Sequence, residues 1–243
     1  MRLMLLAVTA FLAFAIAAIA LAPARLAHDA LLAPHGISAA SVSGTIWNAR
    51  WQGLAYGRMR VREVQARLSA LSVLGGAPAF AFTLADGRNR ADGLAILAAD
   101  TAEIRDVSAR LVPASAVLAA GPLAHVLDEP LIISQVQGRF GPRGCEALAG
   151  SVRFAGLTAL DTQGAGRFPA MDGVLECAAG LPAIRLQGET GDVRAEAFMR
   201  FDTAGGTWSL TATSRTEAMT LALRAAGLEG SGSDLRAEGT ASW

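Results

Sequence analysis

The fold class of this protein follows from the stretch Val193-Arg194-Ala195-Glu196-Ala197-Phe198-Met199-Arg200-Phe201, in which apolar and charged residues alternate. Apolar side chains occupy every odd position, and only Phe198 interrupts the polar set. Successive side chains of a β-strand point to opposite faces, so this period predicts a strand with one buried and one solvated face. Such strands are typical of antiparallel sheets.

The same alternation recurs along most of the chain from about residue 40 onward. Further examples contain Phe80, Phe82 and Leu84; Val152 and Phe154; Ile184 and Leu186; and Trp208, Leu210 and Ala212. Dipeptides rich in Gly and Asp predict hairpin turns at Asp86-Gly87, Asp92-Gly93, Asp172-Gly173 and Gly205-Gly206. We therefore predict a mainly β protein built as a long, twisted, mostly antiparallel sheet assembly with two short helices.

In two segments the alternation shifts by one residue, as at a β-bulge. One shift separates Met59 and Val61 from Val64, and the other separates Ile104 from Val107. The two predicted helices cover residues 114–127 and the segment after the N-cap candidate Thr216. The second carries the helical spacing Met219, Ala222, Leu223 and Ala226, with Gly227 as its stop.

The N-terminus carries an apolar run, residues 3–22, whose only hydroxyl is Thr9. A helix of that length spans about 30 Å, the hydrocarbon thickness of a bilayer. A removable signal peptide is the alternative, but Pro23 disfavours both small-residue cleavage candidates, Ala20-Leu21-Ala22 and Ala22-Pro23-Ala24. We predict an uncleaved transmembrane anchor over residues 1–25 and one β-rich domain over residues 26–243, with a possible seam near residues 138–144.

Composition excludes several classes of protein. The 21 basic residues, all arginine, balance 21 acidic residues, so there is no basic footprint for nucleic acid. The three histidines are scattered, and no metal-ligand spacing occurs. Cys145 and Cys177 are the only cysteines; they form either one disulfide, if the compartment is oxidising, or two buried free thiols.

No catalytic or nucleotide-binding motif is present, so we expect neither an enzyme nor a cofactor. Arg58, Arg60 and Arg62 share one face of a predicted strand. That face is either an ordinary solvated surface or a basic contact for an acidic partner or anionic lipid headgroups.

The strongest local signature is the motif Gly44-Thr45-Ile46-Trp47, followed by Trp51. On an uninterrupted strand the two tryptophans would share a face and contribute to a core. The motif, its distance from the N-terminal apolar run and the turn Leu74-Gly75-Gly76 resemble type II secretion system protein N.

This resemblance implies a single-pass protein of the cell inner membrane, with the bulk of its chain in the periplasm and other secretion-system components as partners. It implies an accessory, non-catalytic role in protein export. Our first hypothesis is an interaction protein that contacts these components through an exposed sheet edge or the arginine face, since edge strands are natural docking templates. A second hypothesis is an envelope lipid-binding or lipid-transfer protein, in which Phe80, Phe82 and Leu84 line a curved apolar trough; the alternative is that they fill a closed core.

Overall fold

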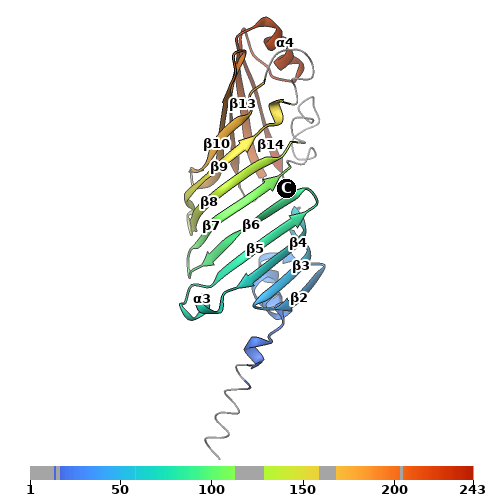
Figure 1. Cartoon of the computed structure of the whole chain (residues 1–243), viewed down its shortest axis with the longest axis vertical. Helices are drawn as coiled ribbons and strands as arrows, with labels where there is room; N and C mark the ends of the chain where they lie inside the picture. The colour runs from blue at the N-terminus through green and yellow to red at the C-terminus, as the bar shows by residue number, and fades with distance from the viewer. Residues whose placement is uncertain are drawn as a thin grey trace, which may run out of the picture. The chain divides into compact units, whose positions relative to one another are not determined.

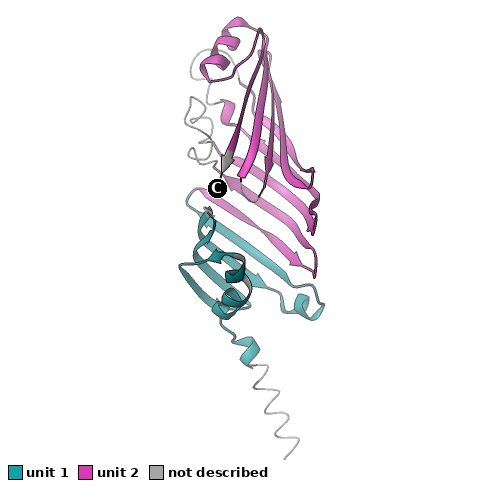
Figure 2. Ribbon diagram, turned by 180° about the vertical axis from the view of Figure 1, so that it is seen from behind, with its two compact units in different colours: residues 1–87 teal, residues 88–243 magenta. Residues whose placement is uncertain are grey.

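The computed structural model describes residues 14, 17–57, 59–112, 129–158, 168–202 and 205–242. The chain divides into two compact units, Met1–Gly87 and Arg88–Trp243 (Figure 2). The described residues form fourteen strands, which pair antiparallel within each unit, and a few short helices. The predicted mainly β, antiparallel fold class is confirmed.

Unit 1 is built around β3, which pairs with β1 and β2 and, through its other edge, with β4; β4 also pairs with β5. The strands are β1 (Ile37–Ser38), β2 (Ser41–Thr45), β3 (Asn48–Tyr56), β4 (Met59–Leu68) and β5 (Ala79–Asp86). The short helices are α2 (Ala24–Ala27), the π-helical turn η1 (His28–Leu32), the 3₁₀ turn η2 (Ala33–His35) and α3 (Ala70–Leu74).

Within the described residues, no helix has the length and apolar character that crossing a bilayer requires. The apolar run of the predicted anchor, residues 3–22, falls mostly outside the described part of the chain, which includes only residue 14 and residues 17–22 of this run.

Unit 2 is a meander in which each strand pairs antiparallel with the next along the chain. Its strand directions turn progressively from β7 to β14, as the prediction of a twisted sheet requires (Figure 1). The strands are β6 (Asn89–Leu97), β7 (Ala102–Leu111), β8 (Leu131–Gly141), β9 (Gly144–Phe154), β10 (Met171–Ala178), β11 (Leu181–Glu189), β12 (Val193–Phe201), β13 (Gly205–Ser214) and β14 (Asp234–Ser242).

The core of unit 2 lies on one face of this meander, toward the end where helix α4 (Glu217–Ala225) connects β13 to β14. Met219 and Leu223 of α4 are buried against strand residues such as Met171, Leu186 and Leu235. The predicted helix after Thr216 is therefore confirmed, and the Thr216 hydroxyl accepts the Met219 amide as an N-cap at 3.2 Å. The other predicted helix, residues 114–127, lies outside the described residues.

Three of the predicted turns are wrong. Gly205 and Gly206 are the first residues of β13, where Gly206 pairs with Phe201 of β12 and with Ala241 of β14. Asp92 and Gly93 lie inside β6, at a register shift against β7, and Asp172 and Gly173 lie inside β10. At Gly173 the reason is close approach, because a Cβ there would overlap the carbonyl oxygen of Arg185 on β11. The glycine permits tight strand contact instead of a chain reversal.

The two predicted bulges have different outcomes. The shift after Ile104 is confirmed, since the β7–β8 register changes between Ile104 and Val107. The shift between Val61 and Val64 is wrong, because β4 keeps one register with β3 through this segment. Val61 and Val64 consequently face opposite sides of the sheet.

Residues 138–144 form the end of β8, the turn and the start of β9. Their glycines and Pro142 serve a hairpin inside unit 2, while the division between the units follows Gly87.

Candidate interaction site

The Gly44-Thr45-Ile46-Trp47 motif is a β-hairpin. Thr45, the last residue of β2, pairs with Asn48, the first of β3, so that Ile46 and Trp47 form a two-residue turn. The expectation that Trp47 and Trp51 share a face of one uninterrupted strand is wrong. Trp47 occupies the turn, whereas Trp51 lies within β3 opposite Val42 and Val64.

Gly44 is required by the geometry of this hairpin. Its φ of 88° lies in the left-handed region, which side chains other than glycine rarely adopt. A Cβ at this position would also overlap the carbonyl oxygen of Asn48 across the hairpin. The glycine of the motif therefore has a conformational role.

The turn binds the end of the N-terminal apolar run. The indole Nε1 of Trp47 donates to the carbonyl oxygen of Ile19 at 3.1 Å, and the amide of Ile46 donates to the carbonyl oxygen of Ala22 at 3.0 Å. Thr45 also forms an isolated antiparallel bridge with Pro23. The Ile19 carbonyl oxygen also accepts the amide of Ala22 at 3.3 Å, so the indole of Trp47 is its second donor. The Ala22 carbonyl lies at the end of the run, where backbone acceptors lack helical donors, and the Ile46 amide supplies one.

The same turn binds the sheet on its other side, where the amide of Leu68 donates to the carbonyl oxygen of Trp47 at 3.0 Å. The motif thus connects two segments far apart in the sequence, the end of the apolar run and the end of β4. Sequence reasoning identified the motif but not this connection, because both partners are backbone carbonyl or amide groups, which leave no signal in the residue types.

Helix α2 packs on β2 and β3 next to this turn. Ala24 is 1% exposed and Ala49 of β3 is 4% exposed, so small side chains allow close contact there. His28 is buried in the following turn, and within the described residues its Nδ1 and the Nε1 of Trp51 have no hydrogen-bond partner.

The predicted arginine face is partly described. Arg60 and Arg62 are exposed on β4, two residues apart and hence on one face, whereas Arg58 lies outside the described residues. In the described part of unit 1, neither forms an ion pair, while the neighbouring Glu63 pairs with Arg50 at 3.0 Å. Their positive charge is therefore available to a partner.

Cys145 and Cys177 form a disulfide in the structure, with a Cα–Cα distance of 5.6 Å. The bond connects the start of β9 to the end of β10, and the Cys145 amide also donates to the carbonyl oxygen of Gly180 at 2.7 Å. These contacts hold the tip of the β8–β9 hairpin against the tip of the β10–β11 hairpin.

The polar face of unit 2 carries rows of ion pairs across and along its strands: Arg139 and Arg105 with Glu103, Arg153 with Asp172, Arg185 with Glu176, Arg194 with Glu196, Arg215 with Glu189, and Arg236 with Glu238. Hydrogen bonds from Arg139 and then from Arg105 hold the pKa of Glu103 below its ordinary value of 4.5. These pairs join seven arginines to six acidic residues, so the positive and negative charges that they bring to this face largely offset one another.

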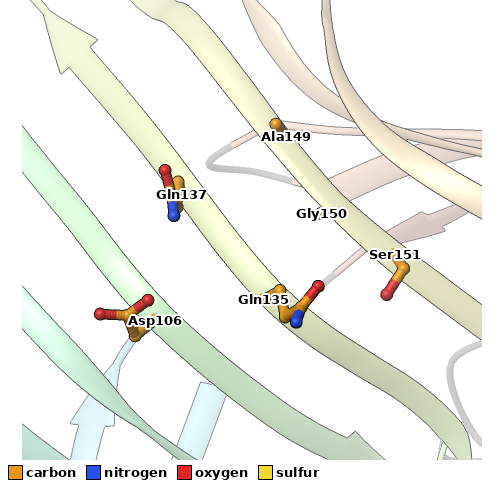
Figure 3. Close-up of a pocket in the computed structure, with 6 residues that line it drawn as sticks. All are labelled: Asp106, Gln135, Gln137, Ala149, Gly150 and Ser151. Carbon is orange, nitrogen blue, oxygen red and sulfur yellow. The ribbon is translucent and has the colours of Figure 1, made fainter.

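A shallow depression of about 550 Å³ lies on the same sheet, at consecutive bulges of β7 and β8 (Figure 3). Asp106 and Gln135 both adopt a positive φ there, and each lies at a register shift with the neighbouring strand. The lining is completed by Gln137, Ala149, Gly150 and Ser151. The lining offers the carboxylate of Asp106, the hydroxyl of Ser151 and two amide side chains, and it contains no basic residue that would attract a phosphate.

Strand β14 is an edge of unit 2, since within the described residues it pairs along its length only with β13. Glu229 covers the start of the free edge by exchanging two hydrogen bonds with Arg236, at 2.7 and 2.8 Å. By strand alternation, the backbone groups of Glu238 and Thr240 point outward in the same direction. Their N–H and C=O groups form a template for another strand.

No cluster of metal-ligating side chains occurs in the described ranges. The described residues form an antiparallel β-sheet protein with an exposed strand edge at β14, in which the end of the N-terminal apolar run is hydrogen-bonded to the motif hairpin.

The family model for type II secretion system (T2SS), protein N matches residues 35–237. The chain belongs to the type II secretion system protein N family, and membership gives it an accessory role in type II secretion alongside other secretion-system components. The family consists of structural components and not of known enzymes. Neither a curated protein nor a solved structure matches this chain.

Proposed function

We propose that this protein is a periplasmic accessory component of the type II secretion system, held at the inner membrane by residues 3–22 as a single retained span. The observation that carries the proposal is the binding of the family motif to the end of that run, through Trp47 and Ile19. Because the motif hairpin is hydrogen-bonded to the end of residues 3–22, we expect the functional protein to retain these residues.

Retention of the N-terminal segment is supported by the hydrogen bonds that cleavage would remove. A cut after Ala22 would separate the acceptors Ile19 and Ala22 from the hairpin, and both hydrogen bonds of the turn would be lost. Pro23 bridges to Thr45 and directs the chain along the edge of β2. The hairpin therefore orients the chain as it leaves the apolar run.

The periplasmic location is supported by the pairing of Cys145 with Cys177. Disulfides persist in oxidising compartments such as the bacterial periplasm and are rare in the cytosol.

For contacts with other secretion components we propose strand addition at the free part of β14. Main-chain hydrogen bonds supply affinity in this mode of recognition, and Glu238 and Thr240 offer them in the required direction. The charged side chain of Glu238 discourages indiscriminate pairing with other edges.

The role in secretion is tested by deleting the gene and measuring secreted enzymes in the medium. We expect secretion to fall and to be restored by the intact gene; unchanged secretion contradicts the proposal. The docking mode is tested by complementation with Thr240→Pro, which removes an outward N–H but no ladder hydrogen bond. The matched control Thr240→Ala keeps that N–H and should secrete normally.

Lipid binding is a second candidate, favoured by one observation. Met199, Leu210 and Leu175 point to the same side as the buried core but remain half-buried. Mass spectrometry of detergent-purified protein tests this candidate: a stoichiometric co-purifying lipid supports it, and lipid-free protein contradicts it.

A further inference from the structure

Helix α3 turns its hydroxyl toward the sheet and its leucines toward the outside. The Ser72 hydroxyl donates to the carbonyl oxygen of Ser69 at 2.6 Å and accepts the amide of Ala79, the first residue of β5, at 2.8 Å. Leu71 and Leu74, three residues apart on the helix, are 82% and 85% exposed. An ordinary surface helix has the opposite arrangement, with leucines inside and serine outside.

The surrounding chain is also apolar. Residues 68–85 contain no charged side chain, and Val73 beside the two leucines is 40% exposed. Single exposed leucines are common on soluble proteins. A helix whose half-buried serine is hydrogen-bonded to the chain while its leucines are exposed is suited to apolar surroundings.

Helix α3 lies near the exit of the N-terminal apolar run. Trp47 bonds Ile19 through its indole and Leu68 through its carbonyl, and α3 begins at Ala70, two residues after Leu68. In both views α3 lies at the same end of unit 1 as the helical turn at residues 17–20 (Figures 1 and 2). Ile19 and Leu21 on that turn are exposed as well.

A positive charge accompanies this apolar patch. Arg67 is exposed at the end of β4, and within the described part of unit 1 it has no ion-pair partner. A cation three residues before a helix with exposed leucines fits the headgroup region of an anionic bilayer, where basic residues meet lipid phosphates and apolar side chains reach the acyl boundary.

We propose that α3 is a second membrane contact, which lies in the surface of the bilayer with Leu71 and Leu74 inserted among the lipids and Arg67 at the headgroups. This inference rests on the proposed anchoring of residues 3–22. Together the two contacts would fix the orientation of unit 1 at the membrane, whereas a single span would allow unit 1 to rotate relative to the bilayer.

The test uses the full chain, reconstituted into vesicles of phosphatidylethanolamine and phosphatidylglycerol. An environment-sensitive fluorophore is attached to Leu71→Cys or Leu74→Cys, and the native cysteines do not react because they are joined in a disulfide. Thr83→Cys on β5, exposed in the same unit, is the matched control. All three substitutions are at exposed positions, so folding should be preserved.

We expect brominated lipids to quench the probes at residues 71 and 74 at least about twofold more than the probe at residue 83. Arg67→Gln should reduce that difference in anionic vesicles but not in phosphatidylcholine vesicles. Probes at 71 and 74 that match the control, in a chain that stays with the vesicles through an alkaline wash, overturn the α3 contact alone. A chain released by the wash overturns the proposed anchoring as well.

Discussion

The indole Nε1 of Trp47 lies 3.1 Å from the carbonyl oxygen of Ile19 and donates a hydrogen bond to it across 28 positions of sequence. This contact connects the Gly44-Thr45-Ile46-Trp47 motif to the end of the apolar run. The N-terminal segment, which the sequence presents only as an anchor or a signal peptide, is therefore also a structural part of unit 1.

Trp47→Phe keeps an aromatic ring and removes the donor. Loss of one such hydrogen bond costs about 1 kcal/mol, so local opening of the turn should become about fivefold more frequent. Amide hydrogen exchange of Ile46, which donates to Ala22, measures this opening. Trp208→Phe, in unit 2, is the control and should leave Ile46 unchanged; equal protection in both variants contradicts the role of the indole.

Gly44→Ala should destabilise unit 1 by about 2 kcal/mol or more, because it adds a Cβ at a positive φ and against the Asn48 carbonyl. Gly57→Ala separates the two causes: φ is 59° there, but no atom lies within 4 Å of the added Cβ. Urea denaturation should therefore show a clearly larger loss for Gly44→Ala. Equal losses of unfolding free energy in the two variants would mean that the hairpin accommodates the added Cβ at residue 44 without a steric penalty.

The double substitution Cys145→Ala with Cys177→Ala should lower the unfolding free energy of unit 2. The disulfide closes a loop with a sequence separation of 32, for which the chain-entropy argument gives about 3–4 kcal/mol. The same comparison can be made without substitution, by measuring the denaturant midpoint of the wild-type protein before and after reduction of the disulfide. Identical midpoints would show that the bond does not constrain the unfolded chain.

Glu103→Gln should make the free energy of unfolding less dependent on pH in the acidic range. Arg139 and Arg105 lower the pKa of Glu103 in the folded protein, so its ion pairs stabilise the fold above the unfolded pKa and are lost as pH falls through the folded pKa. The difference in unfolding free energy between wild type and variant should therefore be present at pH 7 and shrink below about pH 4. Arg139→Gln should reproduce this behaviour, and a difference independent of pH contradicts the assigned cause.

Periodic patterns predicted the strands and the terminal helix well. The alternation from Val193 to Phe201 became β12, and the spacing from Met219 to Ala226 became α4, because in each the side chains that face the core recur at the period of the element. The register shift after Ile104 could also be predicted, because a bulge shifts the alternation of apolar residues by one position.

Signals carried by single residues were less reliable. Gly173 resembled a turn residue but permits close strand contact, and the spacing of Trp47 and Trp51 did not reveal a turn at Ile46 and Trp47. The αL conformations of Asp106 and Gln135 and the outward leucines of α3 have no periodic signature. Each depends on contacts with other strands or with surroundings outside the chain, which local sequence does not encode.

Mass spectrometry of the protein isolated from cell membranes decides whether the proposed N-terminal span is retained and held by the motif hairpin. We expect the protein to stay in the membrane fraction and to retain residues 3–22. Recovery of a soluble periplasmic protein that begins at Pro23 or Arg25, with secretion intact, would contradict it.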